Sequence, residues 1–207
     1  IEAFQTDALS KQLDYVANNS AHYKKLFADL GIEAGDIRSL DDIRKLPLTK
    51  KQDYVSGLAE DPPFGTFRAV SMTDAARVHY SSGPTSKPAP VLWSHDDLDR
   101  WADLYARFLY AQGLRADDVF HCMFGYSWFV GGLEATLAAQ YLGALVIPGG
   151  SVDTERQIDT ILEYRPRCVI GTPSFTAHIA EAAYARGVDL RASSVDMVCV
   201  GGEPGAS

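Results

Sequence analysis

Val119-Phe120-His121-Cys122-Met123-Phe124 is a short apolar run that stops at Gly125 and gives way to a stretch with helical spacing. Short apolar runs and helical stretches continue to alternate as far as Val200. This alternation is typical of parallel strands joined by right-handed helical crossovers, in a sheet covered on both faces. We therefore predict an α/β fold with a doubly wound, mostly parallel sheet flanked by helices. Strands are expected at 119–124, 144–148, 167–171 and 197–200, and helices at about 132–142, 155–164 and 174–186.

Two helix starts carry capping signals. Ser94, with Asp97 three residues later, predicts the start of a helix that Gly113 closes. Thr154 and Gln157 predict a capping box at the start of a later helix. The large apolar residues of the first of these helices form one predicted core stripe, made of Leu98, Trp101, Leu104, Tyr105, Phe108 and Leu109.

The amino-terminal part has a different character. Its first 44 residues place apolar side chains at helical spacing, and Gly31 is expected to end a helix. Residues 61–65 are predicted to be a loop. We predict two parts, a helical lead-in with its linker at 1–65 and an α/β subdomain at 66–207. Because the chain begins at Ile1 and stops just after an apolar strand, we expect it to be part of a longer protein.

Composition limits the class of protein. With 46% hydrophobic and 22% charged residues, the chain has the composition of a soluble globular protein. No apolar stretch approaches the roughly 20 residues that cross a bilayer, and no basic-then-apolar signal segment opens the chain. We expect a cytoplasmic protein with no membrane partner. The net charge of -8 argues against a nucleic-acid partner, which would favour a basic face.

The residue types that most often bind metals show no metal-binding pattern. Cys122, Cys168 and Cys199 lie in separate apolar runs without C-x-x-C spacing, so we expect buried reduced thiols. The histidines lack metal-like spacing, and we predict no metal site. No G-x-G-x-x-G follows a strand, which argues against a nicotinamide-linked reductase.

The loops that follow the predicted strands share a feature. Each contains glycine or a small polar residue, and in open α/β sheets ligands bind beyond the carboxyl ends of the strands. We therefore expect four turns to meet at one rim of the sheet, at 125–126, 149–150, 172–174 and 201–203.

The run Ser81-Ser82-Gly83-Pro84-Thr85-Ser86-Lys87-Pro88 lies between two expected strands, 76–80 and 90–93. Its hydroxyls, the amides around Gly83 and the Lys87 ammonium can converge on a polyphosphate. It is not a Walker loop, because Pro88 and a strand follow the lysine in place of a helix. An ordinary turn contains the same residue types and remains the alternative.

The order strand, loop, strand and helix resembles the phosphate loop of the acyl-adenylate-forming ligase superfamily. The run Phe-Gly-Tyr-Ser-Trp-Phe-Val-Gly-Gly-Leu at 124–133 is similar to the Tyr-Gly-Tyr-Gly-Leu-Phe-Thr-Gly-Gly-Leu run of phenylacetate:coenzyme A ligases. Shorter matches fall in the family's order at 46–50, 154–157, 172–174 and 202–204. The resemblance spans roughly residues 45 to 207 and is weaker before them, where the family has a helical lead-in.

The resemblance implies an AMP-forming acid:coenzyme A ligase. Such an enzyme activates a carboxylic acid, here aryl or arylacetic, with ATP and Mg²⁺ to an acyl adenylate, and then passes the acyl group to coenzyme A. The implied phosphate-binding residues are Ser81, Ser82, Gly83, Thr85, Ser86 and Lys87. The residues implied to lie against adenine and ribose are Gly202, Glu203 and Pro204. The implied acyl pocket has Tyr126 and Phe129 as aromatic walls and Gly131 and Gly132 as a flat floor.

Some of these assignments have simpler alternatives. Gly131-Gly132 is also what a tight strand-to-helix turn needs, and Glu203 is also what a solvated turn carries. Pro84 and Ser86 depart from the family's phosphate loop, so that either ATP binds a stiffer loop or the loop has lost its function. Trp128 replaces a leucine of the family and would narrow the pocket.

Two other functions remain open beside the coenzyme A ligase. One is adenylation of an aryl acid for a carrier-protein thiol, and the other is a non-catalytic nucleotide- or acyl-binding relative with a degenerate loop. The family's catalytic lysine, magnesium motif and ribose-binding aspartate would follow Ser207. The catalytic residues are therefore unknown, no metal ligand is predicted within the chain, and we expect this fragment alone to be inactive. A homodimer is one option for its assembly.

Overall fold

The computed structural model describes residues 1–81 and 88–204. Contacts divide it into two compact units, Ile1–His95 and Asp96–Ser207. The helical lead-in therefore shares a unit with the two strands that follow it. The predicted domain boundary after residue 65 stays a prediction. None of the helices in the described ranges has the length and apolar character needed to cross a membrane.

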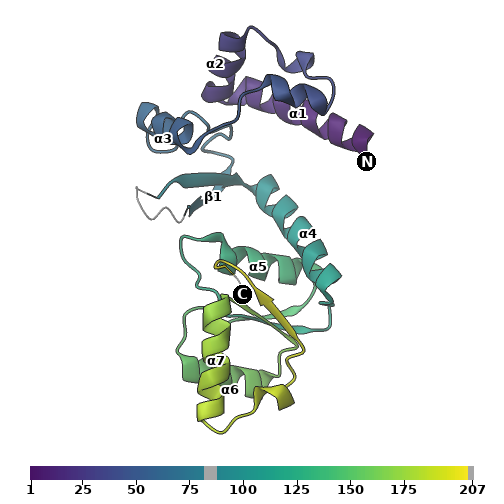
Figure 1. The fold of residues 1–207 in the computed structure, drawn as a ribbon, viewed down its shortest axis with the longest axis vertical. Helices are drawn as coiled ribbons and strands as arrows, with labels where there is room; N and C mark the ends of the chain where they lie inside the picture. Colours follow the sequence, from purple (N-terminus) through teal and green to yellow (C-terminus); the bar gives the residue numbers. More distant parts are fainter. Residues whose placement is uncertain (82–87, 205–207) are drawn as a thin grey trace. The chain divides into compact units, whose positions relative to one another are not determined.

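The first unit is helical and ends in a hairpin of two strands (Figure 1). Its small core consists of Leu13, Phe27 and Ile37, which confirms the predicted helical lead-in. Ser20 stands between the first two helices, and its hydroxyl accepts a hydrogen bond at the start of the second one. The same hydroxyl donates to the Thr66 carbonyl at 3.0 Å, which ties this corner to the segment after α3. The elements are α1 (Glu2–Asn19), α2 (Ala21–Leu30), η1 (Ala34–Asp36), η2 (Asp41–Lys45), α3 (Lys51–Glu60), β1 (Ala75–Tyr80) and β2 (Pro90–Ser94).

The hairpin of β1 and β2 is antiparallel, with Val78 opposite Leu92. Its neck is closed by two hydrogen bonds: Ser81 N donates to the Ala89 carbonyl at 3.0 Å, and Ala89 N donates to Ser81 Oγ at 3.2 Å. The two strands thus form where the sequence predicted them, on either side of the hydroxyl-rich run. They make a separate sheet from the parallel one.

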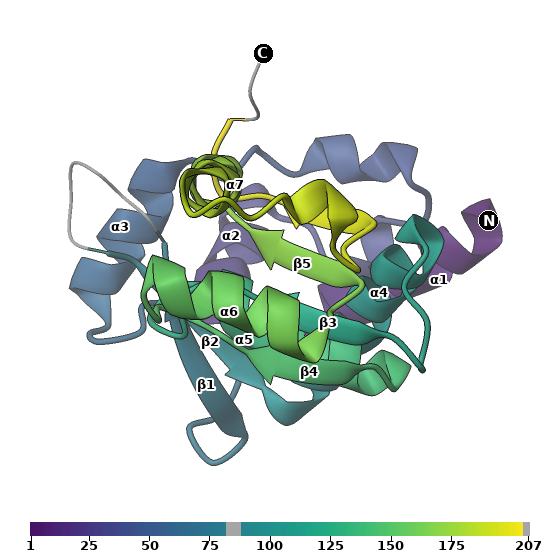
Figure 2. The ribbon, with the colours of Figure 1, turned by 90° about the horizontal axis from the view of Figure 1, so that it is seen from below.

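The second unit contains a sheet of four parallel strands in the order β4-β3-β5-β6. Figure 2 shows β3 between β5 and β4. The predicted doubly wound α/β fold is confirmed, and β6 has the bounds that the sequence predicted. The elements are α4 (His95–Gln112), β3 (Val119–Cys122), α5 (Val130–Leu142), β4 (Leu145–Pro148), α6 (Thr154–Tyr164), β5 (Cys168–Gly171), α7 (Pro173–Ala185), η3 (Leu190–Ala192) and β6 (Met197–Val200).

Alternate residues of the strands build two cores, one on each face of the sheet. Phe120 and Cys168 point to the face covered by α4 and α5, where they meet Leu109. Val169 points to the other face, where it packs with residues of α6 and α7 such as Ile158. This alternation is why the strands read as continuous apolar runs.

Helix α4 buries part of the predicted stripe. Its fully buried residues are Ala102, Ala106 and Leu109, spaced four and three residues apart. The prediction is confirmed for Leu109 and for Tyr105, which packs against the same core. It was wrong for Leu104, which is 68% exposed, and for Phe108, which is 49% exposed. The prediction counted only large apolar side chains, whereas alanines allow close helix packing and mark the buried face.

Helix α6 begins differently from the predicted capping box. Asp153 is the N-cap residue, and its side chain accepts a hydrogen bond from Arg156 N at 2.8 Å. Thr154 is already inside the helix, and the Gln157 side chain points into the protein interior, where it is fully buried. The capping-box prediction was wrong because a carboxylate one residue earlier meets the free amides at the helix start.

One arginine links several segments at the end of the parallel sheet where the strands begin. Arg167 lies 2.7 Å from Asp118 and 3.1 Å from Asp196, and it donates to the Gly113 carbonyl at 2.7 Å. These contacts join the end of α4 to the starts of β3 and β6. The turns that the sequence predicted to share a rim lie at the opposite end of the sheet, where the strands end.

Candidate functional site

The strand order creates a switch point between β3 and β5. From β3 the chain crosses to β4 on one side, and from β4 it crosses back to β5 on the other. Ligands of open α/β sheets bind beyond the carboxyl ends of the strands at such a point. The turns at 125–126, 149–150, 172–174 and 201–203 follow the four parallel strands, so they share one rim as predicted.

Phe124 lies where three parts of this rim meet. A β-carbon at Gly131, in the first turn of α5, would lie 3.3 Å from Phe124 Cγ. A β-carbon at Gly202, after β6, would lie 4.0 Å from Phe124 Cε1. The predicted acyl residue Gly131 and the predicted nucleotide residue Gly202 therefore flank one aromatic ring. Phe124 stands within the run that resembles the ligases, although it was not among the predicted site residues.

Gly132 is required by internal packing. A β-carbon there would lie 2.6 Å from the Gly125 carbonyl oxygen and 3.1 Å from the Phe124 carbonyl oxygen. Contacts this short leave no room for any side chain, and both atoms belong to the backbone. The simpler alternative, a tight turn between strand and helix, therefore accounts for this glycine. Its side of α5 is filled by protein.

Tyr126 is fixed by its ring and by its hydroxyl. The ring packs on Gly150, where a β-carbon would lie 2.9 Å from Tyr126 Cδ2. The hydroxyl lies 2.7 Å from Thr136 Oγ1 on α5. Burial raises the pKa of Tyr126, which keeps the phenol protonated. Phe129, by contrast, is 50% exposed, so of the two predicted aromatic walls only Tyr126 is held on both sides.

Glu203 lies at the amino end of α7. Its carboxylate accepts hydrogen bonds from Ser174 Oγ at 2.9 Å and from Ser174 N at 3.2 Å. Thr172 is the N-cap of the same helix and accepts from Phe175 N. The Ser174 hydroxyl and amide lower the pKa of Glu203. The carboxylate thus joins the turn after β6 to the turn after β5.

Replacing Ser174 with alanine is expected to raise the pKa of Glu203 toward its ordinary value of 4.5. The hydroxyl is the largest cause of the lowered pKa, and the variant removes it. Because a lowered carboxyl pKa stabilises the fold above the unfolded pKa, this stability is lost as the pH falls through the folded pKa. NMR titration of the Glu203 carboxyl carbon measures the change. Ser193→Ala, at a distant serine, is the control, and an unchanged Glu203 titration in Ser174→Ala would contradict the contact.

Most of the predicted phosphate loop lies outside the described residues. This applies to Ser82, Gly83, Thr85, Ser86 and Lys87. Ser81, the first residue of the run, is described, and its hydroxyl accepts the Ala89 amide at the neck of the hairpin. Its role toward a phosphate stays a prediction.

Comparison with known proteins identifies the family. A family model described as AMP-binding enzyme matches residues 17–206, which is most of the chain. The chain belongs to the AMP-binding enzyme family. Within this family, the resemblance to phenylacetate:coenzyme A ligases that was read from the motifs is confirmed by whole-chain similarity.

Curated relatives of this AMP-binding chain are phenylacetate-coenzyme A ligases. The ligase of Escherichia coli (strain K12) is 38% identical over 205 residues, which cover 99% of this chain and 46% of the relative. The ligase of Aromatoleum evansii is 37% identical over 204 residues, which cover 99% of this chain and 45% of the relative. The chain therefore spans about half the length of the curated relatives it matches.

Solved structures with the same fold are ligases in complex with their intermediates. An open conformation of 2-hydroxyisobutyryl-CoA ligase with 2-HIB-AMP and CoA matches with a TM-score of 0.92 and 26% identity, covering all of this chain and 48% of that one. The same ligase in its thioesterification state matches with a TM-score of 0.91 and 26% identity, covering all of this chain and 45% of that one. The match supports the fold assignment independently of the motifs.

The part of the AMP-binding chain that the structure describes has no carboxylate or thiol cluster of the kind that binds metals. Within residues 1–81 and 88–204, no group of three or more His, Cys, Asp or Glu is placed to hold a metal ion. The three cysteines are free thiols, with Cys122 and Cys168 buried and Cys199 partly buried. The predicted burial is confirmed for Cys122 and Cys168, whereas Cys199 is only partly buried.

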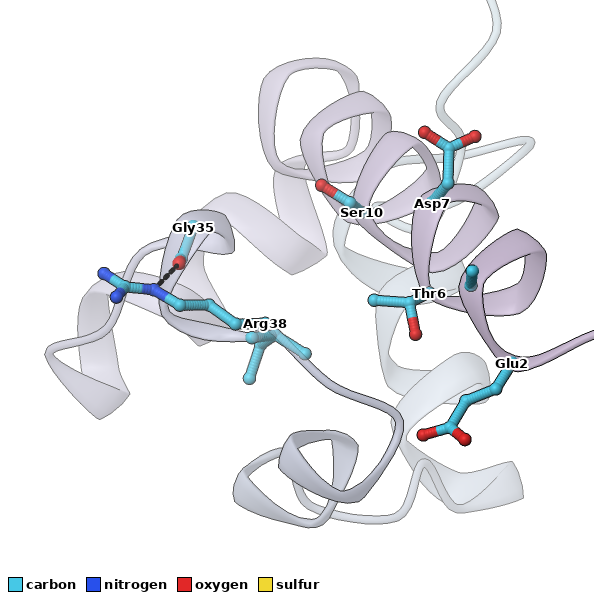
Figure 3. A pocket seen from close by; sticks show the side chains of 8 residues that line it. Glu2, Thr6, Asp7, Ser10, Gly35 and Arg38 are labelled. Carbon is cyan, nitrogen blue, oxygen red and sulfur yellow. Dashed lines mark hydrogen bonds between the residues drawn. The ribbon is translucent and has the colours of Figure 1, made fainter.

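A separate open depression lies in the first unit, between α1 and η1 (Figure 3). Arg38 on its border donates from Nε to the Gly35 carbonyl at 3.1 Å. The depression contains none of the predicted site residues. Its lining consists of Glu2, Ala3, Thr6, Asp7, Ser10, Gly35, Ile37 and Arg38.

Proposed function

We propose that the protein is an AMP-forming acid:coenzyme A ligase whose acid substrate is aryl or arylacetic. The observation that carries this proposal is the meeting of family-matching turns at the switch point of the sheet. The turns after β3, β5 and β6 all match the ligases in sequence. The turn after β6 lies beside Phe124, in the turn after β3, and the hydrogen bonds between Glu203 and Ser174 join it to the turn after β5. The curated phenylacetate-coenzyme A ligases support the substrate class.

The proposed reaction has two steps. A carboxylate oxygen of the acid attacks the α-phosphorus of ATP, the bond to the bridging oxygen breaks, and pyrophosphate leaves. The thiol sulfur of coenzyme A then attacks the carbonyl carbon of the acyl adenylate, the thiol proton is lost, and AMP leaves. The first step turns a poor leaving group into a good one, and fixed hydrogen-bond donors and cations around the phosphates favour it.

The predicted site residues divide between ATP and the acid. The run 81–88 would hold the β- and γ-phosphates, with Lys87 as its cation. The turn 202–204 would lie against adenine and ribose. Because Ser174 engages the carboxylate of Glu203, we assign Glu203 the role of holding this turn in place, and Gly202 presents backbone to the nucleotide. Tyr126 and Phe129 would line the acid site, with Gly131 behind them, whereas Gly132 would let α5 pack closely on the turn that carries Tyr126.

Mg²⁺ would neutralise charge on the phosphates when it is bound. The described residues do not fit a magnesium site, since they offer no cluster of carboxylates for it. No step above depends on a protein ligand to the metal. We place the protein in the cytoplasm, with the acid, ATP and coenzyme A as its partners.

The two alternatives differ from this proposal in testable ways. Pro84 and Ser86 favour a degenerate loop and hence a binding protein, since proline removes an amide donor from the run. Trp128, 61% exposed beside the proposed acid site, favours a substrate that differs from phenylacetate itself. A carrier-protein thiol in place of coenzyme A would leave the first step unchanged.

Pyrophosphate exchange by the full-length protein tests the proposal. We expect exchange with an aryl or arylacetic acid of a panel that includes phenylacetate and benzoate, little with palmitate or phenylalanine, and thioester formation with coenzyme A. 2-Hydroxyisobutyrate belongs in the panel because of the structural match. Preference for a long-chain fatty acid or an amino acid would contradict the aromatic site. Acyl transfer to a phosphopantetheine carrier alone would favour the first alternative, and nucleotide binding without exchange the second.

A further inference from the structure

A buried pair of side chains lies directly beneath the rim. His121, in the middle of β3, and Gln157, in the first turns of α6, are both fully buried. His121 Nε2 and Gln157 Oε1 are 2.6 Å apart. Buried polar side chains cost stability unless they are fully hydrogen-bonded, so a pair at this place calls for a physical reason.

The pair holds the turn after β4. Gln157 Nε2 donates to the Gly150 carbonyl at 3.1 Å, and Gly150 N donates to the Cys122 carbonyl at 3.0 Å. Both peptide groups of Gly150 are therefore fixed. Gly149 packs closely on the imidazole, because a β-carbon there would lie 2.5 Å from His121 Cε1. The position of this turn is thus set by contacts from β3 and α6 together.

The hydrogen bonds also define the protonation of the pair. Since the Gln157 amide nitrogen donates to Gly150, its oxygen faces His121, and the imidazole must donate from Nε2. Burial lowers the pKa of His121, against the opposing effect of the Gln157 and Ile147 oxygens. The pair is therefore a neutral donor and acceptor.

The turn in its place supports Tyr126. Gly150 has a φ of +57° and presents bare backbone to the tyrosine ring, where a β-carbon would lie 2.9 Å from Cδ2. Tyr126 is held from the other side by Thr136. A continuous line of contacts therefore runs from His121 through Gln157 and Gly150 to the aromatic residue assigned above to the acid.

We propose that His121 and Gln157 are positioning residues that set the depth of the acid site by fixing the Gly149-Gly150 turn behind Tyr126. This inference rests on the proposed function, because Tyr126 belongs to the acid site only there. The hydrogen bonds of the pair join β3, α6 and the turn after β4, whereas the turn assigned to the nucleotide is held by Ser174 and Glu203. Loosening it therefore affects binding of the acid and leaves binding of ATP unchanged.

The test uses Gln157→Glu in the full-length protein. When it is ionised, glutamate keeps the shape and can still accept from His121, but it cannot donate to the Gly150 carbonyl. Burial favours the protonated carboxyl, which could donate, so the constants are compared at a pH above the raised pKa of this glutamate. We expect the KM for the acid to rise about tenfold, the effect of one lost buried hydrogen bond, while the KM for ATP changes less than about twofold. Gln157→Asn, which is too short to bridge, should give the same selective rise. Steady-state pyrophosphate exchange measures both constants.

Ile161→Val is the matched control. Ile161 lies one turn further along α6, is 3% exposed, and packs into the core with Ile158 and Ile179. It should lower the melting temperature and leave both KM values unchanged. Equal rises of the two KM values in the Gln157 variants, a lower melting temperature without a change in KM, or failure of both variants to fold would each overturn the positioning role. Absence of exchange by the wild-type protein with every acid would instead refute the proposed function.

Discussion

Gly132→Ala is expected to destabilise the protein by about 1–3 kcal/mol, the usual range for overpacking. The new β-carbon would lie 2.6 Å from the Gly125 carbonyl oxygen and 3.1 Å from two further backbone atoms. No side-chain rotation relieves a clash with backbone, so the start of α5 or the turn after β3 must shift. Alanine is favoured over glycine inside a helix by roughly 0.8–1.0 kcal/mol, which offsets only part of this cost.

Urea denaturation of the wild-type and variant proteins measures the effect. Gly201→Ala is the control on the same rim, because a β-carbon there meets no atom of the described residues within 4 Å, and its stability should change little. The same shift should slow pyrophosphate exchange, since it moves the turn that carries Tyr126. A Gly132→Ala protein as stable as the wild type would show that α5 approaches the turn less closely than described.

The strands and their shared rim could be predicted because their signals are local. Each parallel strand is a short apolar run bounded by glycine or proline, and β6 needed no adjustment at either end. Once four parallel strands are established, the meeting of their following turns follows from the direction of the chain. The hairpin could be predicted as well, because β1 and β2 flank a run of small polar residues.

The sequence signals failed where a residue's partner is distant along the chain. Gln157 fits a local capping box in sequence, yet its partner is His121, 36 residues away. Local spacing favours the cap, and only the fold brings β3 under α6. Glu203 and Ser174, 29 residues apart, are a second case. Neither pair could be inferred from periodicity.

The glycines show a third kind of limit. Gly131 and Gly132 were assigned to the acid because missing side chains permit close approach. The inference of close approach was right, but the approaching group at Gly132 is the backbone of Gly125. A glycine in a sequence indicates that another group approaches the backbone closely, but it does not indicate whether that group is a ligand or another part of the protein. Around Gly131 the neighbour is the Phe124 ring, which can itself move.

Lys87→Ala is expected to weaken the use of ATP by about 1.5–3 kcal/mol, which corresponds to roughly a 10- to 150-fold fall in kcat/KM for ATP. The reason is chemical. Lys87 is the one cation in the run 81–88, and in a chain with a net charge of -8 the phosphates depend on local donors. Pyrophosphate exchange at varied ATP measures the loss. Lys24→Ala, at an exposed lysine of α2, is the control and should leave the rate unchanged.

The same assay distinguishes a working loop from a degenerate one. If the loop works, restoring the family residues with Pro84→Thr and Ser86→Gly should change the rate only modestly, because the stiffer loop already binds ATP. If Lys87→Ala leaves adenylation unchanged while the two reversions together raise it by orders of magnitude, the loop has lost its function. The phosphates would then lack their cation, and a nucleotide- or acyl-binding protein would explain the chain better than a ligase.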